Sequence, residues 1–139
     1  MKKLTALVLA LCMALGLAAC GGSKDTGSAA GSTAAASGDT VKIGVYEPQS
    51  GDNGAGGKQE ILGVQYANSV APTVEIGGKT YNVKLEIVDN ESSNDKAVSA
   101  ASQLVSQGVS VVLGSYGSGV SIAASDTFKN AGVPAIGIT

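Results

Sequence analysis

A glycine-rich stretch is the part of the chain best suited to hold a ligand. Residues 111–121 carry an apolar run, three glycines and three serines. This order predicts a buried strand, a tight turn and the first turn of a helix. Ser118 lies where the helix is expected to begin, so its hydroxyl is placed to cap backbone amides. Those amides and the helix dipole favour a carboxylate or another anion. A helix cap without any ligand remains the alternative role for Ser118.

Composition excludes several other kinds of chemistry. The 139 residues carry a net charge of −2 and contain neither histidine nor tryptophan. Histidine-based acid–base catalysis and histidine metal ligation are therefore excluded. The only basic cluster is Lys2 and Lys3, so nucleic acid is not an expected partner. The glycines match neither a phosphate loop nor a dinucleotide fingerprint. We expect no catalytic residue, metal or cofactor, and hence no enzyme.

The first 19 residues have the features of an export signal. Two lysines precede an apolar run over residues 4–17, which is short for a transmembrane helix. Residues 17–20 read Leu-Ala-Ala-Cys and resemble the bacterial lipobox. The resemblance implies cleavage before Cys20 and lipid on that cysteine. An ordinary secretory signal with an incidental cysteine is the alternative. We expect an extracytoplasmic protein anchored to the cell membrane by lipid.

A flexible linker is predicted over residues 20–40. Beyond Cys20 this segment consists mainly of glycine, serine, alanine and threonine. It has too little apolar surface to offset the entropy of ordering. It would therefore act as a tether between the membrane and a folded domain that starts at residue 41.

The domain over residues 41–139 alternates predicted strands and helices. Strands are predicted at 41–46, 83–88, 109–113 and from 133, helices at 58–70, 94–107 and 118–130, and a hairpin at 73–81. Such alternation predicts an α/β three-layer sandwich with a parallel sheet. Ligands bind beyond the carboxyl ends of the strands in such sheets.

Three local details also follow from the pattern. The helix over 58–70 is expected to bury Leu62, Tyr66 and Val70, which lie one above another. The alternating strand over 83–88 is expected to be an outer strand. The polar residues 89–91 are interpreted as a solvated strand end leading to a cap at Ser93.

The ordered set of motifs resembles a known family. Ile43-Gly44-Val45 with its glycine loop, Val88-Asp89-Asn90, the stretch 114–118 and residues 131–134 follow one another in that order. Together they are similar to the branched-chain amino-acid (Leu/Ile/Val) binding proteins of ABC importers. The resemblance implies the first lobe of a type I periplasmic-binding fold, here incomplete. It also implies a two-lobed protein that closes on an amino acid or similar solute and docks to permease subunits.

The resemblance also implies which residues contact the solute. Ser118 matches the family's carboxylate-binding serine, and Thr139 begins the next contact segment. The family often places an aromatic residue over the ligand where this chain has Gly56, and the nearest aromatic residue is Tyr46. We therefore expect contacts at six positions: Tyr46, Gly56, Tyr116, Gly117, Ser118 and Thr139.

The sequence ends where the family's second lobe would follow. We expect a truncated gene or a partial sequence, and little ligand binding by half a cleft. Two other functions stay open at this point. One is a sensory or regulatory ligand-binding domain of the same fold without transport. The other is a flavodoxin-like or Rossmann-type enzyme, against which the glycine spacing argues.

Overall fold

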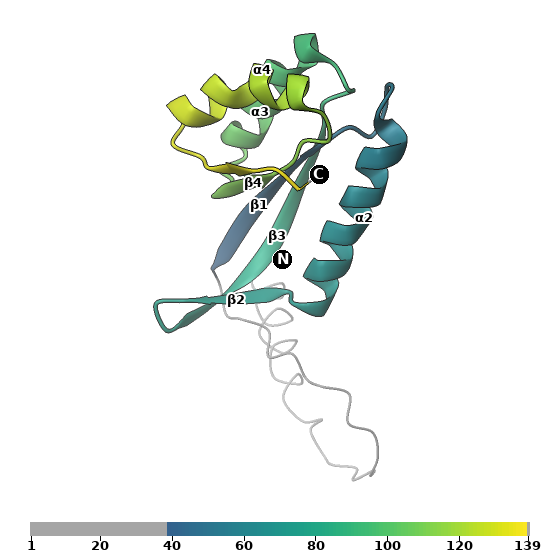
Figure 1. The fold of residues 1–139 in the computed structure, drawn as a ribbon. Helices are drawn as coiled ribbons and strands as arrows, with labels where there is room; N and C mark the ends of the chain where they lie inside the picture. Colours follow the sequence, from purple (N-terminus) through teal and green to yellow (C-terminus); the bar gives the residue numbers. More distant parts are fainter. Residues whose placement is uncertain (1–38, 139) are drawn as a thin grey trace, which may run out of the picture. The chain divides into compact units, whose positions relative to one another are not determined.

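The computed structural model describes residues 39–138. The predicted signal peptide, Cys20, most of the linker and Thr139 lie outside these residues. The described elements are β1 (Thr40–Glu47), α2 (Gly54–Val70), β2 (Thr73–Ile76), β3 (Lys79–Asp89), α3 (Asn94–Ser106), β4 (Val111–Leu113), α4 (Ser118–Asn130) and β5 (Ala135–Ile136) (Figure 1). Among these helices, none combines the length and apolar character needed to cross a membrane.

The strands of the described part form one sheet in the order β2-β3-β1-β4-β5. Strand β1 pairs in parallel with β3 and β4, and β4 pairs in parallel with β5. The predicted parallel sheet is therefore confirmed. The prediction that the strand over 83–88 is an outer strand is wrong, because β2 folds back antiparallel against β3. Gly77 and Gly78 make this hairpin turn at φ values of 60° and 78°, which suit glycine.

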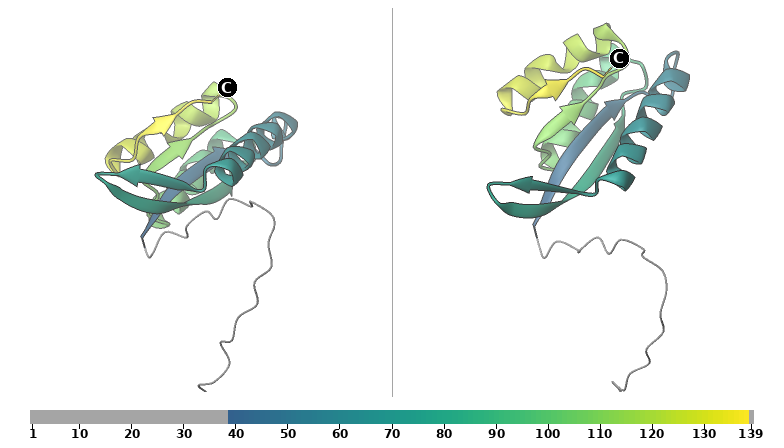
Figure 2. Two further views of the ribbon diagram at one scale, coloured as in Figure 1. Left: turned by 90° about the horizontal axis from the view of Figure 1, so that it is seen from below. Right: turned by 60° about the horizontal axis from the view of Figure 1, so that its bottom comes forward.

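Helices cover both faces of the sheet. Helix α2 lies on one face, and α3 and α4 lie side by side on the other (Figures 1 and 2). This arrangement confirms the predicted three-layer α/β sandwich. It also brings the carboxyl ends of β1, β3 and β4 to one edge of the sheet, since these strands run in parallel.

The main hydrophobic core lies between the sheet and the helices α3 and α4. Alanines on both helices allow close approach to the strands, and Leu104 and Phe128 fill the larger spaces. Phe128 meets the Tyr46 ring edge to face, with 5.5 Å between the ring centroids. The buried members are Tyr46, Val88, Ala97, Ala100, Ala101, Leu104, Val109, Val112, Val120, Ala124 and Phe128.

Helix α2 starts earlier than its sequence predicts. The prediction begins at residue 58, whereas the helix begins at Gly54. Glycine disfavours helix by about 1 kcal/mol relative to alanine. Close packing explains why the helix forms here, because a Cβ on Gly57 would collide with Pro48, and one on Gly54 would press on the Gln49 backbone. These glycines allow the first turn of α2 to lie directly against the loop that follows β1.

The predicted buried face of α2 is wrong. Leu62, Tyr66 and Val70 are 57%, 72% and 67% exposed, whereas Ile61 is only 7% exposed. The helix is therefore rotated relative to the predicted orientation. Its buried positions are Gly54, Gly57 and Ile61, and two of these three are glycines that contribute no apolar side chain. The spacing of the large apolar residues predicted a buried face on the side of the helix that is in fact exposed.

A pair of neighbouring substitutions tests this orientation of α2. We expect Ile61→Ala to lower the free energy of unfolding by about 2 kcal/mol or more, because it opens a cavity against the sheet. We expect Leu62→Ala to change it by less than about 0.5 kcal/mol, because that side chain is exposed. Urea unfolding followed by circular dichroism measures both. A larger loss for Leu62→Ala than for Ile61→Ala would contradict the orientation.

Candidate functional site

The predicted ligand turn connects β4 to α4 at the carboxyl edge of the sheet. We call residues 114–117 the β4–α4 turn. Strand β4 ends at Leu113, and α4 begins at Ser118, as predicted. Gly114 and Gly117 have φ values of 116° and 113°, a region that side chains with a Cβ rarely adopt. The turn therefore needs glycine at both of these positions.

Three different elements hold the amides of this turn. The Gly114 amide donates to the Ile136 carbonyl of β5 at 2.9 Å. The Ser115 amide donates to the Ser121 hydroxyl at 3.4 Å, and the Tyr116 amide donates to Glu47 Oε2 at 2.7 Å. Because strand, helix and side-chain partners all contribute, the turn is positioned relative to β1, α4 and β5 at once.

Ser118 is not the cap residue that its position suggested. The N-cap is Gly117, and α4 begins without any side-chain cap hydrogen bond. Ser118 is the first helical residue and is exposed. The proposed cap role is therefore wrong, and the hydroxyl lies beside the first amides of the helix, which have no partner within the helix itself.

The start of α4 opens onto a depression in the surface. We call this depression the α4 hollow. Its volume is about 530 Å³, and it is lined by Ser115, Tyr116, Gly117, Ser118, Ser121, Ile122 and Gly137. This volume lies within the range of small-molecule sites. Three of the predicted contact residues thus lie on one segment that lines the α4 hollow, namely Tyr116, Gly117 and Ser118.

Gly56 lies against the ring of Tyr116. A Cβ on Gly56 would come within 2.9 Å of two atoms of that ring, Cε2 and Cζ. The structure therefore brings together two of the predicted contact positions that are 60 residues apart in the sequence. The Tyr116 ring fills the space beside α2 that a side chain at residue 56 would need.

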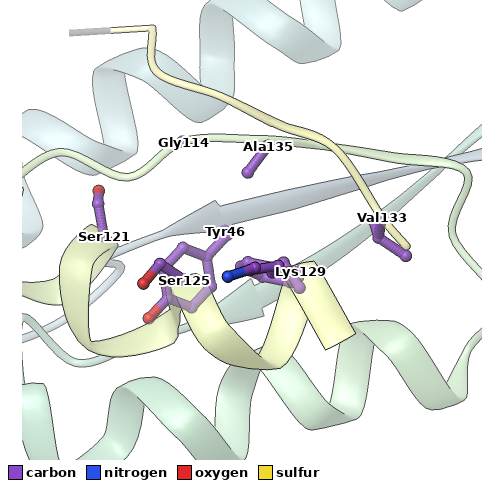
Figure 3. Close-up of a pocket in the computed structure, with 8 residues that line it drawn as sticks. Tyr46, Gly114, Ser121, Ser125, Lys129, Val133 and Ala135 are labelled. Carbon is purple, nitrogen blue, oxygen red and sulfur yellow. The ribbon is translucent and has the colours of Figure 1, made fainter. Parts of the chain in front are cut away.

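Tyr46 lies elsewhere. Its side chain is 1% exposed, and its hydroxyl donates to the Val120 carbonyl at 3.3 Å. Burial, followed by the charge of Glu47, raises the pKa of Tyr46. The ring borders a smaller cavity beneath α4 of about 210 Å³, together with Ser121, Ser125 and Lys129 (Figure 3). A ligand contact through Tyr46 stays a prediction that this burial does not support. The predicted contact at Thr139 lies outside the described residues.

Asn90 is a site residue that sequence reasoning missed. The sequence was interpreted as a solvated strand end here, but Asn90 is 0% exposed, so that interpretation is wrong for this residue. Its Nδ2 donates to Ser115 Oγ at 2.8 Å and to the Tyr46 carbonyl at 3.3 Å, and its Oδ1 accepts from the Ser92 amide. The available signal was its position directly after a predicted parallel strand, where strand ends converge.

Asp89 fastens the loop that follows β1. Its Oδ1 accepts from the Gln49 and Glu91 amides at 2.7 and 2.8 Å, and its Oδ2 accepts from Ser50 Oγ at 2.7 Å. Burial opposes ionisation of this carboxyl, but the hydrogen bonds outweigh burial and lower the pKa of Asp89. The ionised form therefore ties the β1–α2 loop to the end of β3.

Glu47 is a second residue that the sequence analysis passed over. It ends β1, is 0% exposed and accepts the Tyr116 amide. Burial raises the pKa of Glu47. The hydrogen bond from Tyr116 acts in the opposite direction, and the neighbouring carboxyl of Glu60 raises the pKa further. The site thus contains an acid that resists ionisation directly behind the turn.

These features suit binding of a small anion. Backbone amides at the start of a 13-residue helix meet the hydroxyl of Ser118 at the surface of the α4 hollow. Amide donors and the positive end of the helix dipole favour a carboxylate there. The hydrogen bonds to the turn hold it in place before a ligand arrives.

The sequence profile of a family described as periplasmic binding protein matches residues 40–139. No curated protein matches the chain. The chain is similar to the leucine-binding protein LivK from Thermotoga maritima, at 30% identity over 70% of this chain and 27% of that protein, with a TM-score of 0.64.

Two further solved structures contain a ligand. The branched-chain amino acid transporter substrate-binding protein LivJ from Streptococcus pneumoniae, in complex with isoleucine, is 35% identical over 71% of this chain and 28% of that protein, with a TM-score of 0.62. An ABC transporter solute-binding protein from R. palustris, in complex with benzoate, is 28% identical over 70% and 27%, with a TM-score of 0.59. The chain thus spans little more than a quarter of the length of these proteins.

The charge of Asp89 predicts a particular pH dependence. Because the folded-state pKa lies below the ordinary value of 3.8, its stabilisation is present above that value and is lost as the pH falls through the folded-state pKa. We expect Asp89→Asn to lower the free energy of unfolding at neutral pH by about 1–3 kcal/mol. This difference from the unmodified chain should shrink as the pH is lowered below about 4.

Urea unfolding at several pH values measures this difference. Asp52→Asn is the matched control, because Asp52 is exposed in the same loop. If Asp89→Asn lowers the free energy of unfolding at neutral pH no more than Asp52→Asn does, the proposed role of Asp89 is contradicted.

Proposed function

Because this chain belongs to the periplasmic binding protein family, we propose that it is the extracytoplasmic solute-binding component of an ABC importer. In this proposal it binds a branched-chain amino acid or a related small solute between two lobes and delivers it to permease subunits. Residues 40–139 supply part of the first lobe. The second lobe, the solute and the permease all belong to the proposal, since the chain spans about a quarter of its structural neighbours.

The observation that carries this proposal is the open start of α4 at the carboxyl edge of the sheet. Ser118 is exposed there, has no capping role and lies in the α4 hollow. We propose that the Ser118 hydroxyl and the first amides of α4 bind the carboxylate of the solute. The isoleucine and benzoate bound by two neighbours differ in their side groups, and a carboxylate is the group that both share.

The structure supports the other predicted contacts to different degrees. Tyr116 and Gly117 line the same hollow as Ser118 and are proposed to contact the body of the solute. Gly56 is proposed to act by admitting the Tyr116 ring beside α2. Thr139 is proposed as a contact from the next strand end, and Tyr46 has the weakest support because its ring is buried in the core.

We further propose that the protein is held at the membrane through Cys20. The apolar leader over residues 1–19 ends in a lipobox-like sequence, and residues 21–40 offer a tether rich in small residues. A lipid-anchored receptor on such a tether stays close to its permease while its domain moves freely.

Substitution of Ser118 tests the binding role. We expect Ser118→Ala to weaken isoleucine binding by about tenfold or more, because a hydrogen bond to a charged group is lost. The melting temperature should change little, since the hydroxyl caps nothing. Isothermal titration calorimetry on the product of the complete reading frame measures the affinity.

Ser99→Ala serves as the control, because Ser99 is exposed on α3 and donates only to the nearby Lys96 carbonyl. Unchanged affinity in Ser118→Ala would exclude the role of Ser118. Failure of the unmodified protein to bind isoleucine, leucine and benzoate would reject the proposed class of solute.

Substitution of Cys20 tests the anchor. We expect Cys20→Ala to abolish incorporation of labelled palmitate in bacterial cells and to leave the protein largely outside the membrane fraction. Cys12→Ala should remain fully labelled, because Cys12 lies inside the predicted leader. Equal labelling of the Cys20→Ala variant and the unmodified protein would refute lipidation at this cysteine.

A further inference from the structure

The carboxyl of Glu47 is buried directly behind the β4–α4 turn. Glu47 is 0% exposed, and its Oε2 accepts the Tyr116 amide at 2.7 Å. Its Oε1 is also buried and has no amide, amine or alcohol donor among the described residues. An ionised carboxylate in such a place would lack the hydrogen bonds that normally compensate for burial.

The charges around Glu47 do not compensate for an ionised carboxylate. Helix α2 presents the carboxyl of Glu60, which is near enough to Glu47 to raise its pKa. Strand β3 presents Asp89 as the register partner of Glu47, and that carboxylate is bound to Gln49 and Ser50 instead. No lysine in the described part of the chain forms an ion pair with Glu47. On β1 itself, the neighbouring Tyr46 side chain belongs to the core on the opposite face.

We propose that Glu47 is held in its neutral, protonated form, and that in this form it positions the Tyr116 amide and keeps the start of α4 attractive to anions. Glu47 is thus a positioning residue for the binding site. The consequence for the ligand rests on the proposed function, whereas the protonated state of Glu47 does not.

The sign of the pH effect follows from the protonated state. If this proton is lost, Glu47 itself gains a negative charge beside the Tyr116 amide, two residues before Ser118. That charge repels a bound carboxylate and weakens the helix N-terminus as an anion site. Because the folded state holds this proton above the ordinary glutamate value of 4.5, its stabilising effect is complete below that pH. It is lost as the pH rises through the folded-state value.

The amide of Tyr116 reports this proton directly. In the complete chain, its ¹⁵N–¹H chemical shift should titrate with a midpoint well above 4.5, because its acceptor is the Glu47 carboxyl. In Glu47→Gln the amide group mimics the neutral acid, so the Tyr116 shift should no longer titrate. In Glu60→Gln the like-charged partner is gone, so the midpoint should fall relative to that of the unmodified chain.

Stability and binding give two further readouts. Between about pH 5 and pH 9, the unmodified chain should lose stability in urea as the pH rises, and Glu47→Gln should lose less. Isoleucine affinity of the complete gene product should fall about threefold or more over the same range, and this dependence should disappear in Glu47→Gln. Glu75→Gln, at an exposed position on β2, should behave like the unmodified protein.

The outcomes separate the two proposals. A Tyr116 midpoint near 4.5, or a Glu47→Gln variant with the unmodified pH profile, would overturn the proposal that Glu47 is protonated. If the Glu47→Gln variant does not fold, the Tyr116 midpoints of the unmodified chain and of Glu60→Gln still test whether Glu47 is protonated. A high midpoint without isoleucine binding at any pH would support the protonated Glu47 and reject the proposed function.

Discussion

The structure depends on satisfying the buried backbone of one strand-to-helix turn. Strand β4 is three residues long, and its ladder ends where the chain must change direction. Buried amides need partners, because an unpaired one costs free energy comparable to a lost hydrogen bond. Here the partners are the Ile136 carbonyl, the Ser121 hydroxyl and the Glu47 carboxyl. The position of the candidate site is therefore set by β1, α4 and β5 together.

Polar residues at the strand ends connect the loops to one another rather than to solvent. Glu47 ends β1 and holds the turn after β4, whereas Asp89 ends β3 and holds the loop after β1. Asn90 then links β3 to the same turn through Ser115. These connections arise because parallel strands deliver their carboxyl ends to one edge of the sheet. A ligand at this edge would meet a network that is already formed.

The sequence predicts the layers and the position of the predicted ligand turn well, because the strands and the helices α3 and α4 bury apolar residues, many of them alanines, at regular spacing. Helix α2 differs, since glycines provide much of its buried face and Leu62 and Tyr66 lie outside. The pattern of polar and apolar side chains cannot show where a glycine packs against backbone atoms. Glu47 and Asn90 were missed for a related reason. Their roles come from partners that are distant in sequence, and only their positions at the ends of parallel strands indicated that such partners converge there.

The contact between Gly56 and Tyr116 helps to place one wall of the α4 hollow. Side chains at residue 56 and residue 116 compete for one space, since a Cβ on Gly56 would meet the Tyr116 ring at 2.9 Å. A larger residue at 56 would therefore displace the ring and move the wall of the α4 hollow. Tyr116 is also held through its own amide by Glu47, so one residue contributes both to the wall of the hollow and to the position of the turn. If the α4 hollow binds the solute as proposed, a substitution at residue 56 would affect both the wall of the hollow and the carboxylate contact, because Tyr116 contributes to both.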